Sequence, residues 1–149
     1  MEPCQILVFR LGDVKLAVEC DTVMAVHPPS QVVFTEIENA PEHILGMIFA
    51  GEIRIPVISL YDKLGILPHN DGVNIKVIVV QDGDNLFGII ADQVTGVTSS
   101  LIKELEAEQM FPVDTRFICS LASEGDCQLP VLDWPALFDF EEAIKAIND

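Results

Sequence analysis

The chain contains an internal duplication, and this repeat constrains its fold more than any other feature of the sequence. Residues 7–26 align without a gap on residues 78–97, 71 positions further along. A second window repeats in the same order, because Ile-Pro-Val-Ile at 55–58 matches Leu-Pro-Val-Leu at 129–132, 74 positions away. The identities in the first window are Val8/Val79, Gly12/Gly83, Asp13/Asp84, Asp21/Asp92, Val23/Val94 and Val26/Val97. Two copies of one pattern predict two similar β units of about five strands each.

Each copy begins with a strand, a tight turn and a returning strand. In the first copy, Ile6–Leu11 and Lys15–Val18 are rich in β-branched and apolar residues and flank the turn former Gly12-Asp13. The second copy repeats this arrangement with Ile75–Val80 and Leu86–Ile90. Either unit alone is too small to bury much apolar surface, so we expect the two to pack over a shared core. Units of this size hide their sheet edges by curling into barrels, which predicts a mainly β fold of two β-barrels.

The length suits one domain, 1–149, built from these two units. Hydrophobic residues make up 50% of the chain and the mean hydropathy is +0.38, which allows a sizeable core. We expect the first barrel at about 6–67 and the second at about 73–133, divided by a polar, turn-rich segment. A C-terminal helix at about 135–147 has one broad apolar face and is expected to pack back on the barrels. Residues 99–111 fit a helix by composition, or a strand and connection by their place in the repeat.

The middle of the first copy carries the strongest local signals. Asn39 and Glu42 can form a capping box at the start of a short helix, and Gly46 can end that helix. A hairpin follows, because the turn former at 50–52 separates two apolar runs. Pro56 in the returning strand cannot donate a ladder hydrogen bond, which indicates an edge, a bulge or a bend. A second short helix is expected after that strand.

The charge balance disfavours two classes of partner. Eight Lys and Arg residues stand against 24 Asp and Glu residues, a net charge of −16. Such a charge repels phosphate backbones and anionic lipids, so we expect no nucleic-acid partner and no direct membrane insertion, although the charge could serve solubility alone. The four cysteines are scattered, which favours reduced thiols over zinc ligands. Because the N-terminus lacks a basic signal region, a cytoplasmic location is expected.

No arrangement of residues predicts an enzyme. The repeated aspartates invite comparison with an aspartic dyad, but Asp13 and Asp84 stand in hairpin turns. Asp21 and Asp92 lack the adjoining Thr-Gly or Ser-Gly that would bring backbone amides to a dyad. The three histidines have no ligand partner at metal-binding spacing on the same element. We therefore expect no catalytic residue, no metal and no cofactor.

An interaction surface is the remaining possibility. Phe49 and Ile53 flank the tip of the predicted hairpin, where apolar side chains can serve a partner protein. The same two residues could equally belong to the core.

Five segments, taken in order, resemble the CheW-like family of bacterial chemosensory coupling proteins. They are Leu7–Gly12, Ala40–Gly46, Gly51–Ile58, Gly88–Val94 and Leu129–Asp133. The resemblance implies two five-stranded barrels around a common core, in agreement with the duplication. It also implies a non-catalytic adaptor that joins the cytoplasmic tips of chemoreceptors to the regulatory domain of a CheA-type histidine kinase.

Several polar positions of the family pattern are replaced in this chain. The family hairpin usually reads Gly-Val-Ile-Asn-Leu-Arg-Gly, whereas residues 46–51 are one residue shorter and carry neither the Asn nor the Arg. Ala25 replaces the usual glutamate of the preceding strand, and Ser59 and Tyr61 replace a common Asp and Arg. The resemblance implies that these positions form or buttress the coupling surface, so the losses indicate a drier contact or a different partner.

Seven residues are candidates for the partner surface. They are Ala25, Phe49, Gly51, Glu52 and Ile53 in the first copy, with Ile89 and Val94 marking the equivalent strand of the second barrel. For Ile89 and Val94, core packing is an equally good interpretation. Two other functions stay open: a CheW-like scaffold module repurposed for a different partner, and a ligand-binding or enzymatic β-barrel.

Overall fold

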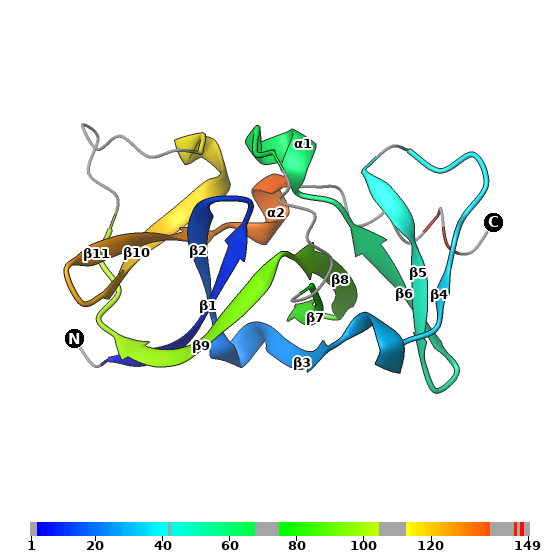
Figure 1. Ribbon diagram of the computed structural model, residues 1–149, viewed down its shortest axis with the longest axis horizontal. Coiled ribbons are helices and arrows are strands. Elements are labelled where there is room, and N and C mark those ends of the chain that lie inside the picture. Colours follow the sequence, from blue (N-terminus) through cyan, green and yellow to red (C-terminus); the bar gives the residue numbers. More distant parts are fainter. Residues whose placement is uncertain are drawn as a thin grey trace.

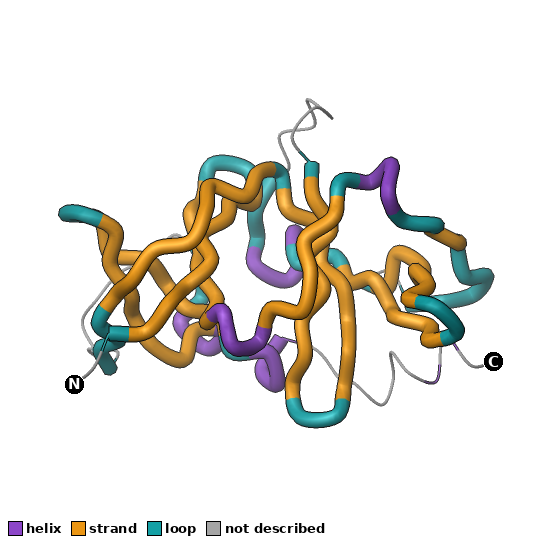
Figure 2. The backbone as a smooth tube through the Cα atoms, turned by 90° about the horizontal axis from the view of Figure 1, so that it is seen from below, coloured by secondary structure: helices purple, strands orange, loops and turns teal. Residues whose placement is uncertain are grey.

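The computed structural model describes residues 3–41, 43–67, 75–104 and 113–137, together with 145 and 147. Strands make up most of this backbone and the helical segments are short (Figure 2), so the mainly β fold class is confirmed. The strands of the first half are β1 (Cys4–Leu11), β2 (Val14–Glu19), β3 (Val23–His27), β4 (Phe34–Thr35), β5 (Ile44–Ala50) and β6 (Ile53–Ile58). Those of the second half are β7 (Lys76–Asp82), β8 (Asn85–Ala91), β9 (Gln93–Ser100), β10 (Ile118–Glu124) and β11 (Cys127–Leu132).

The strands form two sheets that lie side by side (Figure 1). Sheet A has five strands in the order β10-β11-β2-β1-β9, and sheet B has six in the order β3-β7-β8-β6-β5-β4. Hairpin β1–β2 corresponds to β7–β8, and hairpin β5–β6 corresponds to β10–β11. The sixth strand of sheet B is the two-residue β4, which adds to the five strands expected for each unit.

Each sheet combines the first hairpin of one half, β1–β2 or β7–β8, with the later strands of the other half. β3 of the first half pairs with β7, and β9 of the second half pairs with β1. Both pairings have the same register, because Ala25 faces Val79 as Gly96 faces Val8, with a one-residue bulge beside each pair. Each sheet therefore contains strands from both halves, unlike the consecutive barrels expected from the sequence. These pairings give the edges of β1 and β7 a partner strand, which satisfies backbone groups that an open edge would leave exposed.

Two-residue turns close four hairpins in the described chain. They are Gly12-Asp13, Gly51-Glu52, Gly83-Asp84 and Gly125-Asp126. The φ angles of these glycines are 59°, 63°, 60° and 59°, a left-handed conformation that glycine adopts without steric cost. Of the four, Gly12 alone is also tightly packed, since a Cβ atom there would overlap the carbonyl oxygen of Leu67.

The buried apolar side chains of the described residues form three clusters. The largest draws on both sheets and on the helical segments, and it corresponds to the expected shared core. It takes Leu7, Phe9 and Leu11 from β1, whereas the alternate residues Ile6 and Val8 belong to a second cluster on the other face of sheet A. The third cluster lies in sheet B and consists of Ile48, Ile55, Val57, Val77 and Val79.

The helical segments are short. Helix α1 (Tyr61–Leu64) ends at Gly65, whose φ is 71°, as the sequence predicts. Helix α2 (Trp134–Leu137) begins where the C-terminal helix is expected, and most of the remaining range to 147 lies outside the described residues. The indole ring of Trp134 meets Phe87 edge-on, with 5.1 Å between ring centroids. Short 3₁₀ turns lie at Cys20–Thr22, Pro29–Gln31 and Thr115–Phe117.

The prediction of a helix between Asn39 and Gly46 is wrong. Asn39 occupies a turn with φ at 61°, and β5 begins at Ile44. Gly46 lies within β5, packed so closely that a Cβ atom there would overlap the carbonyl oxygen of Thr35. Pairing of β5 with both β4 and β6 satisfies the backbone of this segment, so tertiary pairing overrides the local capping signal. Glu42, the other member of the capping box, lies outside the described residues.

The segment that fitted either helix or strand begins as a strand. β9 continues to Ser100, and Lys103 forms an isolated antiparallel bridge with Leu121 of β10. The Ser100 hydroxyl also accepts a hydrogen bond from the backbone N–H of Ser123, at 2.8 Å. These contacts join the two edge strands of sheet A, which curls the sheet towards a barrel. Residues 105–112 lie outside the described part of the chain.

Candidate functional site

An apolar hollow of about 480 Å³ lies at one end of sheet B. Strand β3, the β5–β6 hairpin and the β7–β8 hairpin surround it, with the turn after β3 on one side. Its lining residues are Met24, Ala25, His27, Gln31, Val32, Ile48, Phe49, Ala50, Gly51, Ile55, Val79 and Leu86. Among the described residues that line it, none is Asp, Glu, Lys or Arg, so an occupant would meet a surface of mainly apolar groups.

The floor and the wall of the hollow differ in burial. Ile48, Ile55 and Val79 form the floor, where each is buried in the apolar cluster of sheet B. Met24 and Phe49 form the wall and keep 55% and 40% of their surface exposed. Met24 is the residue that the β3–β7 bulge leaves without a partner in the ladder. Large exposed apolar side chains beside a concave surface are typical of a protein-binding site.

The structure brings together three of the predicted site residues. Ala25, Phe49 and Gly51 all line the hollow, although they come from two separate strands and a turn. Glu52 and Ile53 lie beside it and line an adjoining cavity of about 350 Å³. Ile53 keeps 56% of its surface exposed, which suits contact with a partner.

The two residues predicted for the second barrel lie elsewhere. Ile89 is 0% exposed and belongs to the shared core, so its side chain cannot reach a partner in this fold. Val94 is half-buried and packs against the same core. Ile89 is buried because hairpin β7–β8 joins the strands of the first half. In that arrangement β8 becomes an inner strand of sheet B, between β7 and β6.

Nine of the twelve described residues that line the hollow were not predicted from the sequence, among them Met24, Val32 and Leu86. These three reach the hollow from segments that are distant in the chain. Leu86 had one available signal, since its repeat-equivalent position is the charged Lys15. An apolar residue that replaces a charged one at an otherwise similar hairpin position indicates a local difference in packing.

The adjoining cavity carries the charged groups that the hollow lacks. Glu52 and Asp84 line it together with Arg54, and Leu86 is common to both cavities. The Arg54 Nη1 atom donates a hydrogen bond to the carbonyl oxygen of Ile147, at 3.2 Å. The guanidinium is therefore hydrogen-bonded to the backbone of Ile147, and both carboxylates line the same cavity.

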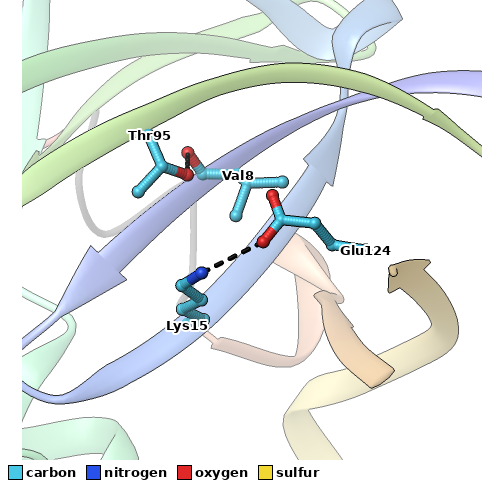
Figure 3. A network of polar contacts seen from close by, with 4 residues as sticks. All are labelled: Val8, Lys15, Thr95 and Glu124. Atoms are coloured by element: carbon cyan, nitrogen blue, oxygen red, sulfur yellow. Dashed lines mark hydrogen bonds and ion pairs between the residues drawn. The ribbon is translucent and has the colours of Figure 1, made fainter. Parts of the chain in front are cut away.

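The corresponding end of sheet A is closed by polar contacts (Figure 3). The Lys15 Nζ atom lies 3.0 Å from Glu124 Oε1, which joins hairpin β1–β2 to hairpin β10–β11. The Thr95 hydroxyl donates a hydrogen bond to the carbonyl oxygen of Val8, at 3.0 Å. Both contacts are made by positions whose repeat equivalents line the hollow of sheet B.

A buried carboxylate ties the two halves together away from the hollow. Asp92 is buried and accepts hydrogen bonds from the backbone N–H of Gly12 and from the Tyr61 hydroxyl. Burial, together with this hydrogen bond to a carboxylate, raises the pKa of Tyr61 above its usual range. The phenol therefore keeps its proton and donates a hydrogen bond to the Asp92 carboxylate. These contacts brace the β1–β2 turn and do not form a reactive site.

The other candidate chemistry is not assembled by the fold. Asp13 and Asp84 occupy exposed hairpin turns, and Asp21 is exposed on the first 3₁₀ turn while Asp92 is buried. Within the described ranges, no group of three or more His, Cys, Asp or Glu side chains is placed to hold a metal ion. None of the helices in those ranges combines the length and the apolar character that a membrane crossing needs.

Comparison with known proteins gives consistent matches. The family model for the CheW-like domain matches residues 5–142. Chemotaxis protein CheW of Klebsiella aerogenes is 27% identical over 146 residues, which covers 97% of this chain and 87% of the relative. Chemotaxis protein CheW of Helicobacter pylori is 24% identical over 94 residues, covering 63% of this chain and 56% of the relative. The crystal structure of scaffolding protein TtCheW from Thermoanaerobacter tengcongensis superimposes with a TM-score of 0.80 at 26% identity, covering 93% of this chain and 90% of that one.

Proposed function

Because the chain belongs to the CheW-like domain family, we propose that it is a non-catalytic adaptor of a chemosensory system. In this proposal it acts in the cytoplasm and couples the tips of chemoreceptors to the regulatory domain of a CheA-type histidine kinase. It needs no metal and no cofactor, since the function consists of protein–protein binding. Its acidic surface disfavours nucleic acids and anionic lipids as alternative partners.

The family match over residues 5–142 is the observation that carries this proposal. The relatives whose matches cover more than nine-tenths of this chain include a chemotaxis protein and a scaffolding protein. The hollow of sheet B supports it further, because it collects Ala25, Phe49 and Gly51 from the surface that the family resemblance assigns to coupling.

Calorimetric titration of the protein with the regulatory domain of a CheA-type kinase from its own organism tests the proposal. We expect saturable binding with a Kd of about 1 µM, typical of a transient signalling interface. A parallel titration with a soluble receptor-tip fragment tests the second partner. Absence of heat and of co-elution with both partners would refute the coupling function.

A second candidate function is a CheW-like scaffold that serves a different partner. Its motivation is the apolar character of the hollow, where Ala25 stands in place of the Glu of the family pattern and the hairpin at residues 46–51 lacks the family's Arg. Crosslinking in cells followed by mass spectrometry distinguishes the two functions. Recovery of a kinase and a receptor supports coupling, whereas reproducible recovery of other proteins alone supports the repurposed scaffold.

A ligand-binding or enzymatic barrel is the third possibility raised by the acid-rich turns. A thermal-shift screen with divalent cations and small metabolites addresses it, because a ligand specific for the folded state raises the apparent Tm. We expect no shift.

A further inference from the structure

The two sheets end differently, although the repeat places equivalent residues at both ends. The equivalence is structural as well as sequential. β9 pairs with β1 in the same register as β3 pairs with β7, and hairpins β10–β11 and β5–β6 both close on a two-residue turn that begins with Gly. The equivalent pairs in sheets A and B are Val8/Val79, Lys15/Leu86, Thr95/Met24, Ser123/Phe49 and Glu124/Ala50. The contacts at these positions in sheet A can therefore be compared directly with those at the equivalent positions in sheet B.

In sheet A these positions hold the end of the sheet together. The Lys15–Glu124 ion pair spans the two hairpins, and Thr95 is hydrogen-bonded to the β1 backbone (Figure 3). The Ser123 side chain adds a third contact, because its hydroxyl lies 3.5 Å from the Ser100 hydroxyl, which also accepts from the Ser123 N–H group. The polar groups at this end therefore form hydrogen bonds and an ion pair with other residues of the same chain.

In sheet B apolar side chains replace the four polar side chains Lys15, Thr95, Ser123 and Glu124. Leu86 and Ala50 cannot form the ion pair, and Met24 cannot form the hydrogen bond made by its threonine equivalent. Phe49, the equivalent of Ser123, is 40% exposed on the wall of the hollow. The duplicated site has lost its internal ties, and an apolar hollow of about 480 Å³ lies at that position.

The charges at the rim indicate what kind of partner segment fits. Glu52 and Asp84 line the adjoining cavity, which shares Leu86 with the hollow, and neither has an ion-pair partner within the described part of the chain. The nearby Arg54 donates to the carbonyl oxygen of Ile147. A segment whose apolar side chain enters the hollow would therefore place its neighbouring residue beside carboxylates, which favours Lys or Arg there.

We propose that the hollow of sheet B binds a partner protein segment through one bulky apolar side chain with a Lys or Arg beside it. This inference rests on the proposed adaptor function in that the occupant is a protein. A second copy of the chain is disfavoured as the occupant, because its net charge of −16 would oppose the acidic rim. At the equivalent end of sheet A, side chains of the chain itself, Lys15 and Glu124, contact each other instead.

The probe for this site is the capped dipeptide N-acetyl-Phe-Lys-amide, followed by two-dimensional ¹H–¹⁵N NMR of the full chain. We expect the dipeptide to shift the amide resonances of Ala25, Phe49 and Leu86 in a saturable manner. N-acetyl-Ala-Lys-amide should bind about tenfold more weakly because it lacks the apolar group, and N-acetyl-Phe-Glu-amide should lose the contribution of the rim. Equal shifts with all three dipeptides, or shifts confined to other parts of the chain, would overturn the proposal.

A double substitution that rebuilds the internal tie provides the decisive variant. Ala50→Glu with Leu86→Lys introduces the ion pair of sheet A into sheet B, and we expect it to weaken dipeptide binding at least about tenfold. Phe49→Ser, the residue at the equivalent position in sheet A, is a second variant in case the double substitution does not fold. The matched control is Lys15→Gln with Glu124→Gln, which breaks the tie in sheet A and should leave dipeptide binding unchanged. Undiminished binding in a folded Ala50→Glu/Leu86→Lys or Phe49→Ser variant would refute the assignment.

Kinase binding separates this inference from the proposed function. If the wild-type protein binds the kinase regulatory domain, the Ala50→Glu/Leu86→Lys variant should bind it at least about tenfold more weakly, and the sheet A control should bind normally. If the wild-type protein does not bind the kinase, the proposed coupling fails while the dipeptide titration still decides whether the hollow is a site. Normal kinase binding by the folded double variant would exclude the hollow from the kinase contact and overturn its assignment as that partner's site.

Discussion

Gly12 and Gly83 occupy equivalent turns but should respond very differently to the same substitution. Both open a two-residue hairpin turn, and their φ angles are 59° and 60°. An alanine in this left-handed region costs about 1–2 kcal/mol relative to glycine at either position. A Cβ atom at Gly83 meets no atom within 4 Å, so Gly83→Ala should cost only this conformational term.

At Gly12 two further effects add to the conformational cost. The new Cβ atom would press into the carbonyl oxygen of Leu67, which is backbone and cannot rotate away, and would lie 3.0 Å from the Ile66 Cγ2 atom. Any shift of the turn to relieve this overlap would also disturb the hydrogen bond from the Gly12 N–H to the buried Asp92. Overpacking and a weakened buried hydrogen bond together add about 2–4 kcal/mol to the conformational term, so Gly12→Ala should destabilise the protein by about 3–6 kcal/mol.

Urea denaturation followed by circular dichroism measures both variants against the wild type. The difference between the two, about 2–4 kcal/mol, isolates the packing of the first turn because the conformational term is common to both. The denaturant slope should be the same in all three proteins. Their free energies of unfolding can then be compared directly, because equal slopes indicate that the same amount of surface is exposed on unfolding. Equal destabilisation by the two substitutions would refute the close approach of residues 12 and 67.

Two further predictions test the buried tyrosine and the division between core and surface. Tyr61 is the single tyrosine of the chain, so absorbance at the tyrosinate band reports its ionisation alone; its raised pKa predicts that tyrosinate forms at higher pH in the folded protein than in urea. The stabilisation linked to this shift should be complete below about pH 10, the usual tyrosine pKa, and should fall as the pH rises through the higher folded pKa. Tyr61→Phe should remove that part of the pH dependence, and an unchanged titration between folded and unfolded protein would contradict the contact with Asp92. Ile89→Ala should cost about 2–5 kcal/mol because the side chain is fully buried, whereas Ile53→Ala, at a residue that is 56% exposed, should cost less than about 1 kcal/mol. Thermal unfolding distinguishes the two, and similar Tm losses would contradict the placement of Ile89 in the core.

The sequence was informative wherever the signal was local. The Gly-Asp turns, the apolar strands beside them and the end of α1 at Gly65 all follow from residues within a few positions of one another. The local signal failed at Asn39–Gly46, because a capping pattern cannot compete with a strand that pairs on both sides. That segment was settled by partners from β4 and β6.

The candidate site was only partly predictable for a related reason. The hairpin position suggested Phe49 and Gly51, but it could not distinguish Phe49, on the wall of the hollow, from Ile89, inside the core. Both are apolar strand residues, and their exposure depends on which strands cover them. The contribution of Met24 and Leu86 depends in the same way on contacts between segments far apart in the chain.

The duplication was determined by the sequence alone, since the two matching windows occur in the same order in each half. The tertiary structure decided how the copies combine: hairpins β1–β2 and β7–β8 each join the later strands of the other half, where β9 and β3 pair with them. Local propensity makes β3 and β9 strands but does not choose the partner of either, because either half offers an edge with the same register. The choice depends on burial over the shared core and on which edges remain open, and these are properties of the whole chain.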